Sequence, residues 1–260
     1  MQLNFDLIQE LIETVKKAYK NSNKLKEKNI KNKELNDIVT DMDLYMENEI
    51  TLFISNKFPQ HSIYSEEIGE DNKQSEYQWL IDPIDGTINF ASGIPLFATS
   101  IALRKEGDTI FGIIFDWNQD DVYYCLKGQG AFCNDKPIHV SKTNALKNSV
   151  ISFCLTSHYN EEHIKKVLNV EEKLASKVRG LRLIVTAAIE LAWCASGKID
   201  GCLNVKPSIG LSSAAGKLLV QEAGGMVTNL EGEKRKNIDT MLVTNGYIHD
   251  ELLSAIKKNN

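Results

Sequence analysis

The amino-acid sequence predicts a mixed architecture of helices and sheets, an α/β protein of the α+β type. Apolar residues recur at helical spacing near the N-terminus, short β-rich runs fill residues 63–153, and both patterns alternate from about residue 161 onward. The 260 residues, of which 42% are apolar and 25% are charged, suffice for one large or two closely joined globular domains with a substantial core.

Two helices are predicted near the N-terminus. The apolar positions that define the first are Phe5, Leu7, Ile8, Leu11, Ile12, Val15 and Tyr19. Those of the second, which follows Asp43, are Leu44, Tyr45, Ile50, Leu52, Phe53 and Phe58. Charged residues interrupt the first stretch, so it lacks the continuous apolar region of a secretion signal, and we expect a cytoplasmic protein.

The middle of the chain predicts a largely antiparallel sheet. Its β-rich runs, divided by Gly, Asp and Asn, are WLI, TSIAL, TIFGIIF, DVYYC and NSVISF. Residues 86–103 carry no charge, yet their glycines, Pro95 and hydroxyl side chains are incompatible with an unbroken membrane-spanning helix. We expect a buried turn, a short helix and a strand there, and no membrane partner.

The second half mixes strands with helices. Its clearer helices are AAIELAWCASG and SSAAGKLLVQEAGG, and each ends in glycine, as helices often do. No linker rich in Pro or Ser separates the halves. We expect residues 1–150 to form an N-terminal α+β half and residues 151–260 a C-terminal α/β half, packed as one continuous unit around a shared cleft.

The composition argues against several classes of function. Lys plus Arg is 30 and Asp plus Glu is 35, a net charge of −5, so no general basic field favours nucleic acid, and a small-molecule partner fits better. The five cysteines contain no CxxC pair and are expected to be reduced, mostly buried thiols. P-loop, GxSxG and HExxH motifs are absent from the sequence, and the five histidines show no ligand spacing.

The stretch WLIDPIDGTINF, residues 79–90, places Asp82 and Asp85 three residues apart around a proline. We expect the leading apolar residues to form a buried strand that Pro83 ends, because proline fixes φ and has no amide hydrogen. If a first helical turn follows, both aspartates face the same side and the Ile84 carbonyl is free. Such hard oxygen ligands suit Mg²⁺.

Two further acidic segments are expected to reach the same cleft, with Glu66 in YSEEIG and Asp43 in DIVTDMD. Gly86 allows close backbone approach, and the amides of Gly86 and Thr87 at a helix start offer donors to a phosphate group. A bound cation lowers the pKa of a coordinated water and offsets phosphoryl charge, as hydrolysis of a phosphate monoester requires. Simpler readings stay open: DPxDG as an ordinary turn, Glu66 and Glu67 as solvated residues, and Asp43 as a helix N-cap.

The stretch WLIDPIDGTINF closely resembles the signature of the inositol monophosphatase family, lithium-sensitive, magnesium-dependent phosphatases that share a fold with fructose-1,6-bisphosphatase. Segments that resemble its other motifs extend the resemblance over nearly the whole chain; they are YSEEIG, DIVTDMD, GQGAFCNDKPIHVS, GLRLIVTAAIELAWCASGKIDG and LLVQEAGG. The resemblance implies a layered αβαβα sandwich, usually assembled as a homodimer, and two or three bound Mg²⁺ ions.

The resemblance also implies roles for individual residues. Four positions match metal ligands of the family: Glu66, Asp82, the Ile84 carbonyl and Asp85. The metal site therefore falls in the half formed by residues 1–150. Residues matching Asp43 and Thr87 orient the attacking water, and with Glu66 they make up the implied catalytic set. The amides of Gly86 and Thr87 correspond to the phosphate-binding donors.

The sequence departs from the family pattern at one metal-ligand position in the second half of the chain. Family members carry a Trp-Asp pair ten residues before the Glu of the EAGG motif, and its aspartate ligates a second metal. Counting back ten from Glu222 reaches Ser212, preceded by Leu211, so the carboxylate is replaced by a hydroxyl. A neutral hydroxyl is a weak Mg²⁺ ligand, so the resemblance allows fewer ions here, and we expect Ser212 to serve as a helix N-cap.

The residues expected to contact the substrate also differ from the family pattern. The family usually has small residues before the threonine that matches Thr186, where this chain has Leu-Ile-Val at residues 183–185. Asn204 stands at a position where the family often has an acid that contacts inositol. We expect Thr186, Ala187 and Asn204 to contact the substrate, and the resemblance does not extend to inositol specificity.

Three functions stay open. The first is a Mg²⁺-dependent phosphomonoesterase acting on a small sugar, inositol or nucleotide phosphate, supported by the nearly complete first metal site. The second is a paralogue of weak or lost activity, kept as a binding or regulatory protein, supported by Ser212. The third is an RNA-associated accessory role, as in some bacterial relatives, and the acidic balance of the chain argues against it.

Overall fold

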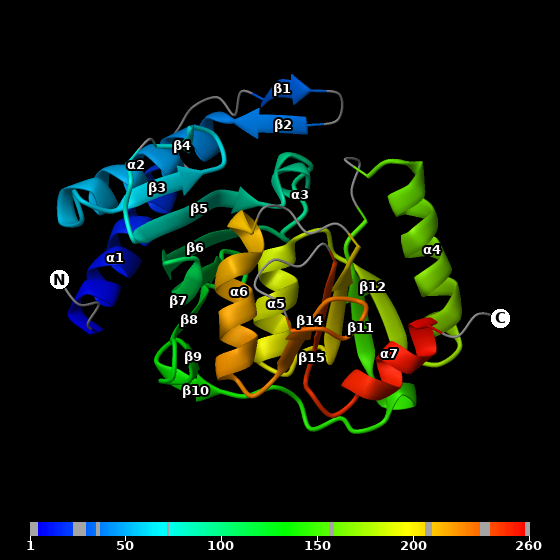
Figure 1. Cartoon of the computed structure of the whole chain (residues 1–260). Helices are drawn as coiled ribbons and strands as arrows, with labels where there is room; N and C mark the ends of the chain where they lie inside the picture. The colour runs from blue at the N-terminus through cyan, green and yellow to red at the C-terminus, as the bar shows by residue number, and fades with distance from the viewer. Residues whose placement is uncertain are drawn as a thin grey trace.

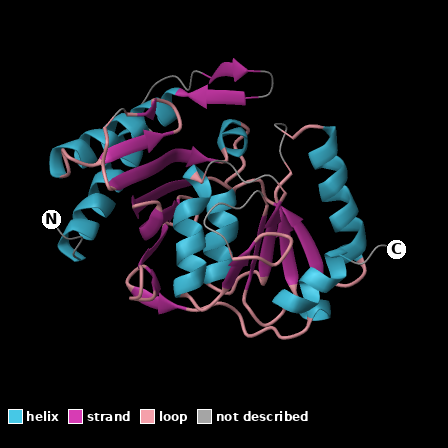
Figure 2. Cartoon of the chain, in the orientation of Figure 1, coloured by secondary structure: helices cyan, strands magenta, loops and turns pink. Residues whose placement is uncertain are grey.

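The computed structural model describes residues 5–22, 30–34, 37–71, 73–155, 159–205, 210–234 and 240–257. Helices and sheets alternate in five layers, helix, sheet, helix, sheet, helix, which follow one another from left to right in Figure 1. Figure 2 shows the same layers by type of element. The predicted αβαβα sandwich is therefore confirmed.

The first sheet has eight strands in the order β10-β9-β8-β7-β6-β5-β3-β4. Neighbouring strands are antiparallel except for β3 and β5, which are parallel. The bounds are β3 Ser62–Ser65, β4 Gly69–Glu70, β5 Tyr77–Asp85, β6 Ala98–Lys105, β7 Asp108–Asp116, β8 Asp121–Leu126, β9 Ala131–Cys133 and β10 Lys136–Ile138. The largely antiparallel sheet predicted for the middle of the chain is confirmed.

The second sheet has five strands in the order β12-β11-β13-β15-β14. Strand β11 runs parallel to both its neighbours, and the other pairs are antiparallel. The bounds are β11 Val150–Phe153, β12 Gly180–Leu183, β13 Gly201–Asn204, β14 Met226–Thr228 and β15 Met241–Thr244. The prediction that NSVISF belongs to the first sheet is wrong, because its residues Val150–Phe153 form β11 in the second sheet, between β12 and β13.

The helices fill the other three layers. Their bounds are α1 Phe5–Ser22, α2 Asp41–Lys57, α3 Thr87–Ala91, α4 Glu161–Ala175, α5 Ala187–Ala195, α6 Leu211–Glu222, α7 His249–Lys257 and the 3-10 turn Leu146–Asn148. The second helix begins before Asp43 rather than after it. A hairpin of β1 (Ile30–Glu34) and β2 (Asp37–Thr40) precedes α2. Left-handed glycines follow α5 and α6, at Gly197 and Gly224, as predicted.

Three apolar cores join the layers. The outer face of the first sheet packs against α1 and α2 through residues such as Trp79 and Ile81. The inner faces of both sheets enclose α5 and α6, with Leu80 and Ala98 on one side and Val243 on the other. The far face of the second sheet packs against α4 and α7. The acidic stretch of β5 therefore lies at the boundary between the first two cores.

Two further expectations concern the chain as a whole. Among the described residues, no helix is long and apolar enough to cross a membrane. The five cysteines, all of which the structure describes, form no disulfide, and four of them are buried. They are therefore the reduced, mostly buried thiols that the sequence predicts.

Candidate active site

A bulge near the end of β5 brings the two aspartates onto one face. Asp82 pairs with Ser100 and Asp85 with Ala98, so three steps along β5 match two steps along β6. Since residues two apart on a strand share a face, the extra residue places both aspartates on the side of Ser100 and Ala98. The predicted strand end at Pro83 is wrong, and the helical turn begins only at Thr87, so it does not carry the two aspartates. The strand continues to Asp85, because proline is tolerated at a bulge.

The bulge points the acids toward the central helices. Ile84 stays buried in the core against α1 and α2, while Ser100 Oγ lies 3.3 Å from the Ser212 carbonyl of α6. The Pro83 carbonyl accepts a hydrogen bond of 2.7 Å from Thr99 Oγ1, which satisfies the backbone inside the bulge. The aspartates consequently lie between the first sheet and the helix layer.

Asp82 is a deeply buried acid of the site. It is 3% exposed, and its side chain forms hydrogen bonds with Glu66 and Ser212. Its Oδ1 atom has no hydrogen-bond partner in the described part of the chain. Burial, and then the charge of Asp85, raise the pKa of Asp82 to about 8. A buried carboxyl with an unsatisfied oxygen is suited to neutralisation by a proton or by a cation.

Asp85 connects the cluster to α5. Its Oδ2 accepts a hydrogen bond of 2.7 Å from the Ala188 amide in the first turn of that helix. Burial raises the pKa of Asp85 to about 8, and the charges of Glu66 and Glu190 act in the same direction. The structure therefore brings Glu66, from the turn after β3, together with both aspartates of β5.

Asp43 and Thr87 form a second pair beside this cluster. Thr87 Oγ1 donates a hydrogen bond of 2.9 Å to the Ile84 carbonyl and lies 3.5 Å from Asp43 Oδ1. Asp43 Oδ2 accepts from the Thr40 amide at 2.9 Å and from the Thr40 hydroxyl. Thr40 is the N-cap of α2 and Asp43 the third residue of its capping box, so the N-cap reading of Asp43 is wrong.

Gly86 occupies a position that no other residue fits. Its φ is 90°, and a Cβ there would stand 2.6 Å from Thr186 Oγ1 and 2.9 Å from the Leu96 carbonyl oxygen. Gly86 is the N-cap of α3, and the first amides of a helix have no intrahelical partner. The Gly86 and Thr87 amides thus lie beside the Ile84 carbonyl and the carboxylates.

The second half contributes a neutral side chain where a carboxylate is expected. Helix α6 begins at Leu211 with Gly210 as its N-cap, so the prediction that Ser212 is the N-cap is wrong. Ser212 instead stands in the first turn, and its side chain hydrogen-bonds to Asp82. A hydroxyl therefore satisfies one oxygen of Asp82 without adding negative charge.

The expected substrate residues differ in accessibility. Thr186 is fully buried, and its hydroxyl donates to the Leu96 carbonyl at 2.9 Å, so its side chain presents no surface to a sugar. Ala187 is half-buried at the start of α5. Asn204 is buried at the end of β13, where its Oδ1 accepts a hydrogen bond of 2.6 Å from Tyr159 Oη. The substrate contacts expected of Ala187 and Asn204 stay predictions.

Two buried glutamates that the sequence analysis missed support this site. Glu47 of α2 is fully buried and accepts hydrogen bonds from Ser65 Oγ (2.6 Å) and from the amides of Glu67 (3.0 Å) and Ile68 (2.8 Å). These donors flank Glu66 on both sides, so Glu47 fixes the turn that carries it. The four-residue spacing of Asp43 and Glu47 on one helix face was the available signal.

Glu190 is the second missed residue. It accepts a hydrogen bond of 2.6 Å from Ser152 Oγ and further bonds from the Ile184 and Val185 amides, and burial raises its pKa to about 7. Val185 has a φ of 62°, which is strained for a β-branched residue. Glu190 holds this strained segment next to α5. Its charge inside the apolar run AAIELAWCA was the signal.

The donor atoms of the candidate site suit a hard divalent cation, although their side chains are not arranged as a preformed metal site. Glu66, Asp82, Asp85 and the Ile84 carbonyl supply only oxygen, the donor that Mg²⁺ prefers, and Asp82 leaves one oxygen unpaired. In the described part of the chain, however, no three His, Cys, Asp or Glu side chains already surround a metal-sized point. The Asp82 side chain instead forms hydrogen bonds with Glu66 and Ser212.

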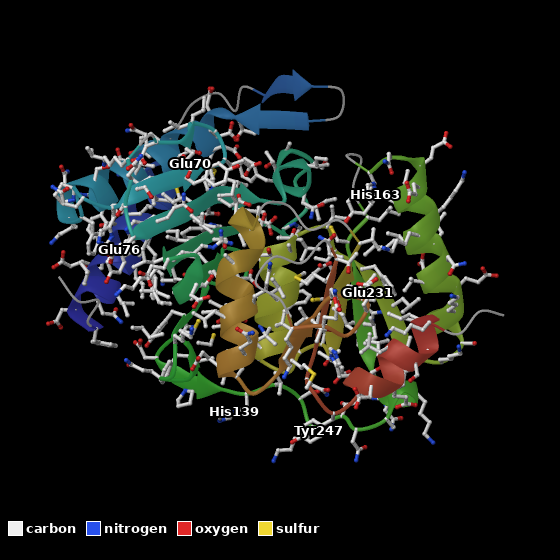
Figure 3. The ribbon with its side chains drawn as sticks, in the orientation of Figure 1. Glu70, Glu76, His139, His163, Glu231 and Tyr247 are labelled. Atoms are coloured by element: carbon white, nitrogen blue, oxygen red, sulfur yellow. The ribbon has the colours of Figure 1, made fainter. Side chains whose placement is uncertain are left out.

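Four of the five histidines lie in the part of the chain that the structure describes. Figure 3 labels His139, in the loop after β10 at the bottom of the view, and His163, near the start of α4 at the upper right. Among the described residues, no histidine belongs to a group that could hold a metal ion.

The fold and the site together define a class of protein. The layered sandwich is that of the inositol monophosphatases. A model of the inositol monophosphatase family matches residues 1–260, so the chain belongs to that family. The family comprises magnesium-dependent phosphatases of the type that includes fructose-1,6-bisphosphatase.

Individual relatives carry different names. An inositol-1-monophosphatase of Mesorhizobium japonicum is 35% identical over 227 residues, which cover 85% of this chain and 84% of that protein. The Nus factor SuhB of Escherichia coli is 32% identical over 236 residues, with 86% of each chain covered. The crystal structure of the extragenic suppressor protein SuhB of Bartonella henselae superposes with a TM-score of 0.89 at 30% identity, covering 98% of both chains.

Proposed function

We propose that the protein is a Mg²⁺-dependent phosphomonoesterase that acts on a small phosphorylated metabolite. The observation that supports this best is the meeting of Glu66 with Asp82 and Asp85 beside the pair formed by Asp43 and Thr87. Acids that are brought close together from separated segments repel one another, and a bound cation would neutralise them.

Each residue has a proposed task. Glu66, Asp82, Asp85 and the Ile84 carbonyl hold the cation, which supplies a more acidic bound water and charge compensation for the phosphoryl oxygens. The Thr87 hydroxyl orients the attacking water and passes the water's proton on to the Asp43 carboxylate, whose Oδ1 lies 3.5 Å from Thr87 Oγ1. The Gly86 and Thr87 amides bind the phosphate group.

The substrate side supports a small ester other than inositol monophosphate. Ala187 and Asn204 are the proposed contacts, and the Tyr159 hydroxyl orients the Asn204 amide. Leu183 is 50% exposed, so the segment before Thr186 offers an apolar surface rather than a polar one. With Ser212 in place of a carboxylate, we propose fewer ions than the two or three expected for the family. A homodimer and a cytoplasmic location stay predictions.

Phosphate release tests this function. A panel of sugar, inositol and nucleotide monoesters is hydrolysed by the purified chain with Mg²⁺ and with EDTA, and Asp85→Asn serves as the matched control. We expect turnover of at least one ester that requires Mg²⁺ and is lost in Asp85→Asn. Release at background rates for every ester would refute the proposal.

A second function is favoured by Ser212, namely a binding or regulatory protein of weak or lost activity. If the parent is inactive and Ser212→Asp switches hydrolysis on, this second function gains support. Some relatives are named Nus factor SuhB, and an RNA-associated role is one variant of this second function. The net charge of −5 argues against RNA binding. A gel-shift assay at physiological salt that shows no complex with RNA would remove that variant.

A further inference from the structure

Two positively charged side chains lie near the start of α6 and within it. Arg104, near the end of β6, and Lys217, in the middle of α6, are both half-buried. Within the residues that the structure describes, neither side chain forms an ion pair or a hydrogen bond. Burial, and then the charge of Arg104, lowers the pKa of Lys217 to about 8. Buried cations are normally paired, so this pair requires an explanation.

The backbone places both cations on one side of α6. Arg104 Nη2 lies 2.7 Å from the point where a Cβ of Gly210, the N-cap of α6, would stand. Lys217 follows Gly210 by seven residues, two helical turns, and therefore lies on the same face. Helical side chains lean toward the N-terminus, which brings the Lys217 ammonium toward the guanidinium.

An unsatisfied hydroxyl lies on the same stripe. Ser213 is four residues before Lys217 and three after Gly210, so these three positions share one face of α6. Ser213 is 2% exposed, and its Oγ has no hydrogen-bond partner in the described part of the chain. Two cations, a buried hydroxyl and the positive end of a twelve-residue helix thus come together.

We infer that Arg104, Ser213 and Lys217 form a binding site for a small tetrahedral oxyanion of the phosphate or sulfate type. Such an ion accepts hydrogen bonds from several donors at once and supplies the charge that both cations lack. Arg104 pairs with Gln78, four residues along the strand from Asp82, a distance of roughly 13 Å, whereas Ser213 adjoins Ser212, whose side chain hydrogen-bonds to Asp82. The inference goes beyond the proposed hydrolysis and does not depend on it.

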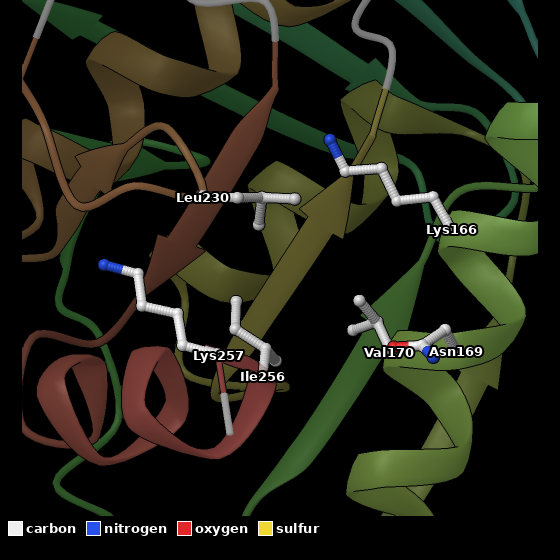
Figure 4. Close-up of a pocket in the computed structure, with 6 residues that line it drawn as sticks. All are labelled: Lys166, Asn169, Val170, Leu230, Ile256 and Lys257. Carbon is white, nitrogen blue, oxygen red and sulfur yellow. The ribbon is translucent and has the colours of Figure 1, made fainter. Parts of the chain in front are cut away.

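Two lysines elsewhere in the molecule differ from Arg104 and Lys217, because their charges need no bound anion. Lys166 and Lys257 stand at the rim of a groove of about 280 Å³ between α4 and α7, with Val170, Leu230 and Ile256 in its floor (Figure 4). Lys257 Nζ donates to the Glu231 carbonyl at 2.9 Å, and Lys166 is exposed to solvent. These lysines are satisfied without an anion, so Lys166→Ala is a matched control for the loss of one positive charge.

Sulfate titration tests the site. The full chain is titrated with sodium sulfate in EDTA at constant ionic strength, and the melting temperature and the heat of binding are recorded. We expect a saturable rise in the parent and in Lys166→Ala. In Lys217→Met and Arg104→Gln we expect at least tenfold weaker binding. Without sulfate, Lys217→Met should melt at or above the parent, because it removes a repulsion between cations.

Three results would overturn the inference. The first is the absence of a saturable response in the parent, and the second is unchanged sulfate affinity in Lys217→Met. The third is a response that depends on protein concentration together with a change of oligomeric state in sedimentation, which would show that a carboxylate of a second copy balances the cations. Inorganic phosphate in place of sulfate distinguishes a general oxyanion site from one that prefers phosphate.

Discussion

The two walls of the candidate active site differ in charge. The wall from the first half contains four acids, Asp43, Glu66, Asp82 and Asp85, and each is held by a defined neighbour. The wall from the second half presents uncharged groups, and Ser212 stands where a carboxylate is expected. In the proposed site, the negative charge that would hold a cation therefore comes almost entirely from the first half.

Hydrogen bonding also distinguishes the proposed metal ligands from the acids that position other residues. The buried Glu47 and Glu190 carry charge on both sides of the cleft, yet both accept several hydrogen bonds from backbone and hydroxyl donors. Asp82, by contrast, retains an oxygen without a partner. Satisfied carboxylates support the walls, and the unsatisfied one marks the proposed ligand.

The largest expected effect comes from removing charge from the acidic wall. Asp82→Asn should lower Mg²⁺-dependent phosphate release on the order of a thousandfold or more, because a buried anionic ligand is lost. The folded state should persist, since asparagine has the same shape and relieves repulsion with Asp85. Turnover is measured at saturating Mg²⁺ alongside the melting temperature. Activity within tenfold of the parent in a folded variant would contradict the assignment.

A smaller effect is expected from adding charge to the neutral wall. Ser212→Asp should raise kcat/KM on the order of a hundredfold at saturating Mg²⁺, because it supplies an anionic ligand next to Asp82. In EDTA the same variant should be less stable than the parent, since another carboxylate is buried beside the cluster. Ser212→Asn, which adds an amide without charge, is the control. Equal activity of both variants would show that charge at this position is unimportant.

Glu47→Gln tests the positioning of Glu66. A glutamine amide cannot accept from all three donors, so we expect a loss of about 1–3 kcal/mol in the free energy of unfolding. Activity should fall about tenfold, because the turn that carries Glu66 loosens. Urea denaturation and turnover are measured together. A stable variant with full activity would exclude Glu47 as a positioning residue.

The smallest effect concerns pH. Asp82 and Asp85 have folded-state pKa values of about 8, above the unfolded value of 3.8, and Glu190 is raised to about 7 from 4.5. Their contribution to stability is therefore complete below about pH 4 and is lost as pH rises through about 8. In EDTA the melting temperature should fall by a few degrees over this window, and Mg²⁺ should restore it at the alkaline end. A flat profile would show that the acids are not buried together.

The sequence predicted the members of the acidic wall because most of them stand in one short stretch. It did not predict how they meet. A proline after a buried strand suggests a strand end, whereas the partner strand decides whether a bulge carries Pro83 through the sheet. The N-cap of α6 was misplaced for a similar reason, because Gly210 lies outside the apolar pattern that located the helix.

Other features depend on contacts between distant segments. The run NSVISF has the composition of any buried strand, and only packing against α4 and α7 assigns β11 to the second sheet. Thr186 lies in a segment that suggests a substrate contact, but the Leu96 carbonyl, ninety residues away, turns its hydroxyl inward. Glu47 and Glu190 were missed because their partners are backbone amides, which no side-chain pattern reveals.

The most direct test of the acidic cluster is the number of protons released when Mg²⁺ binds. Isothermal titration at pH 7.5 in two buffers of different ionisation enthalpy measures this number, because Asp82 and Asp85 with pKa values of about 8 must lose protons to ligate the ion. We predict saturable binding with release of about one proton or more per ion, and neither in Asp82→Asn. Binding without proton release that persists in Asp82→Asn would contradict the account.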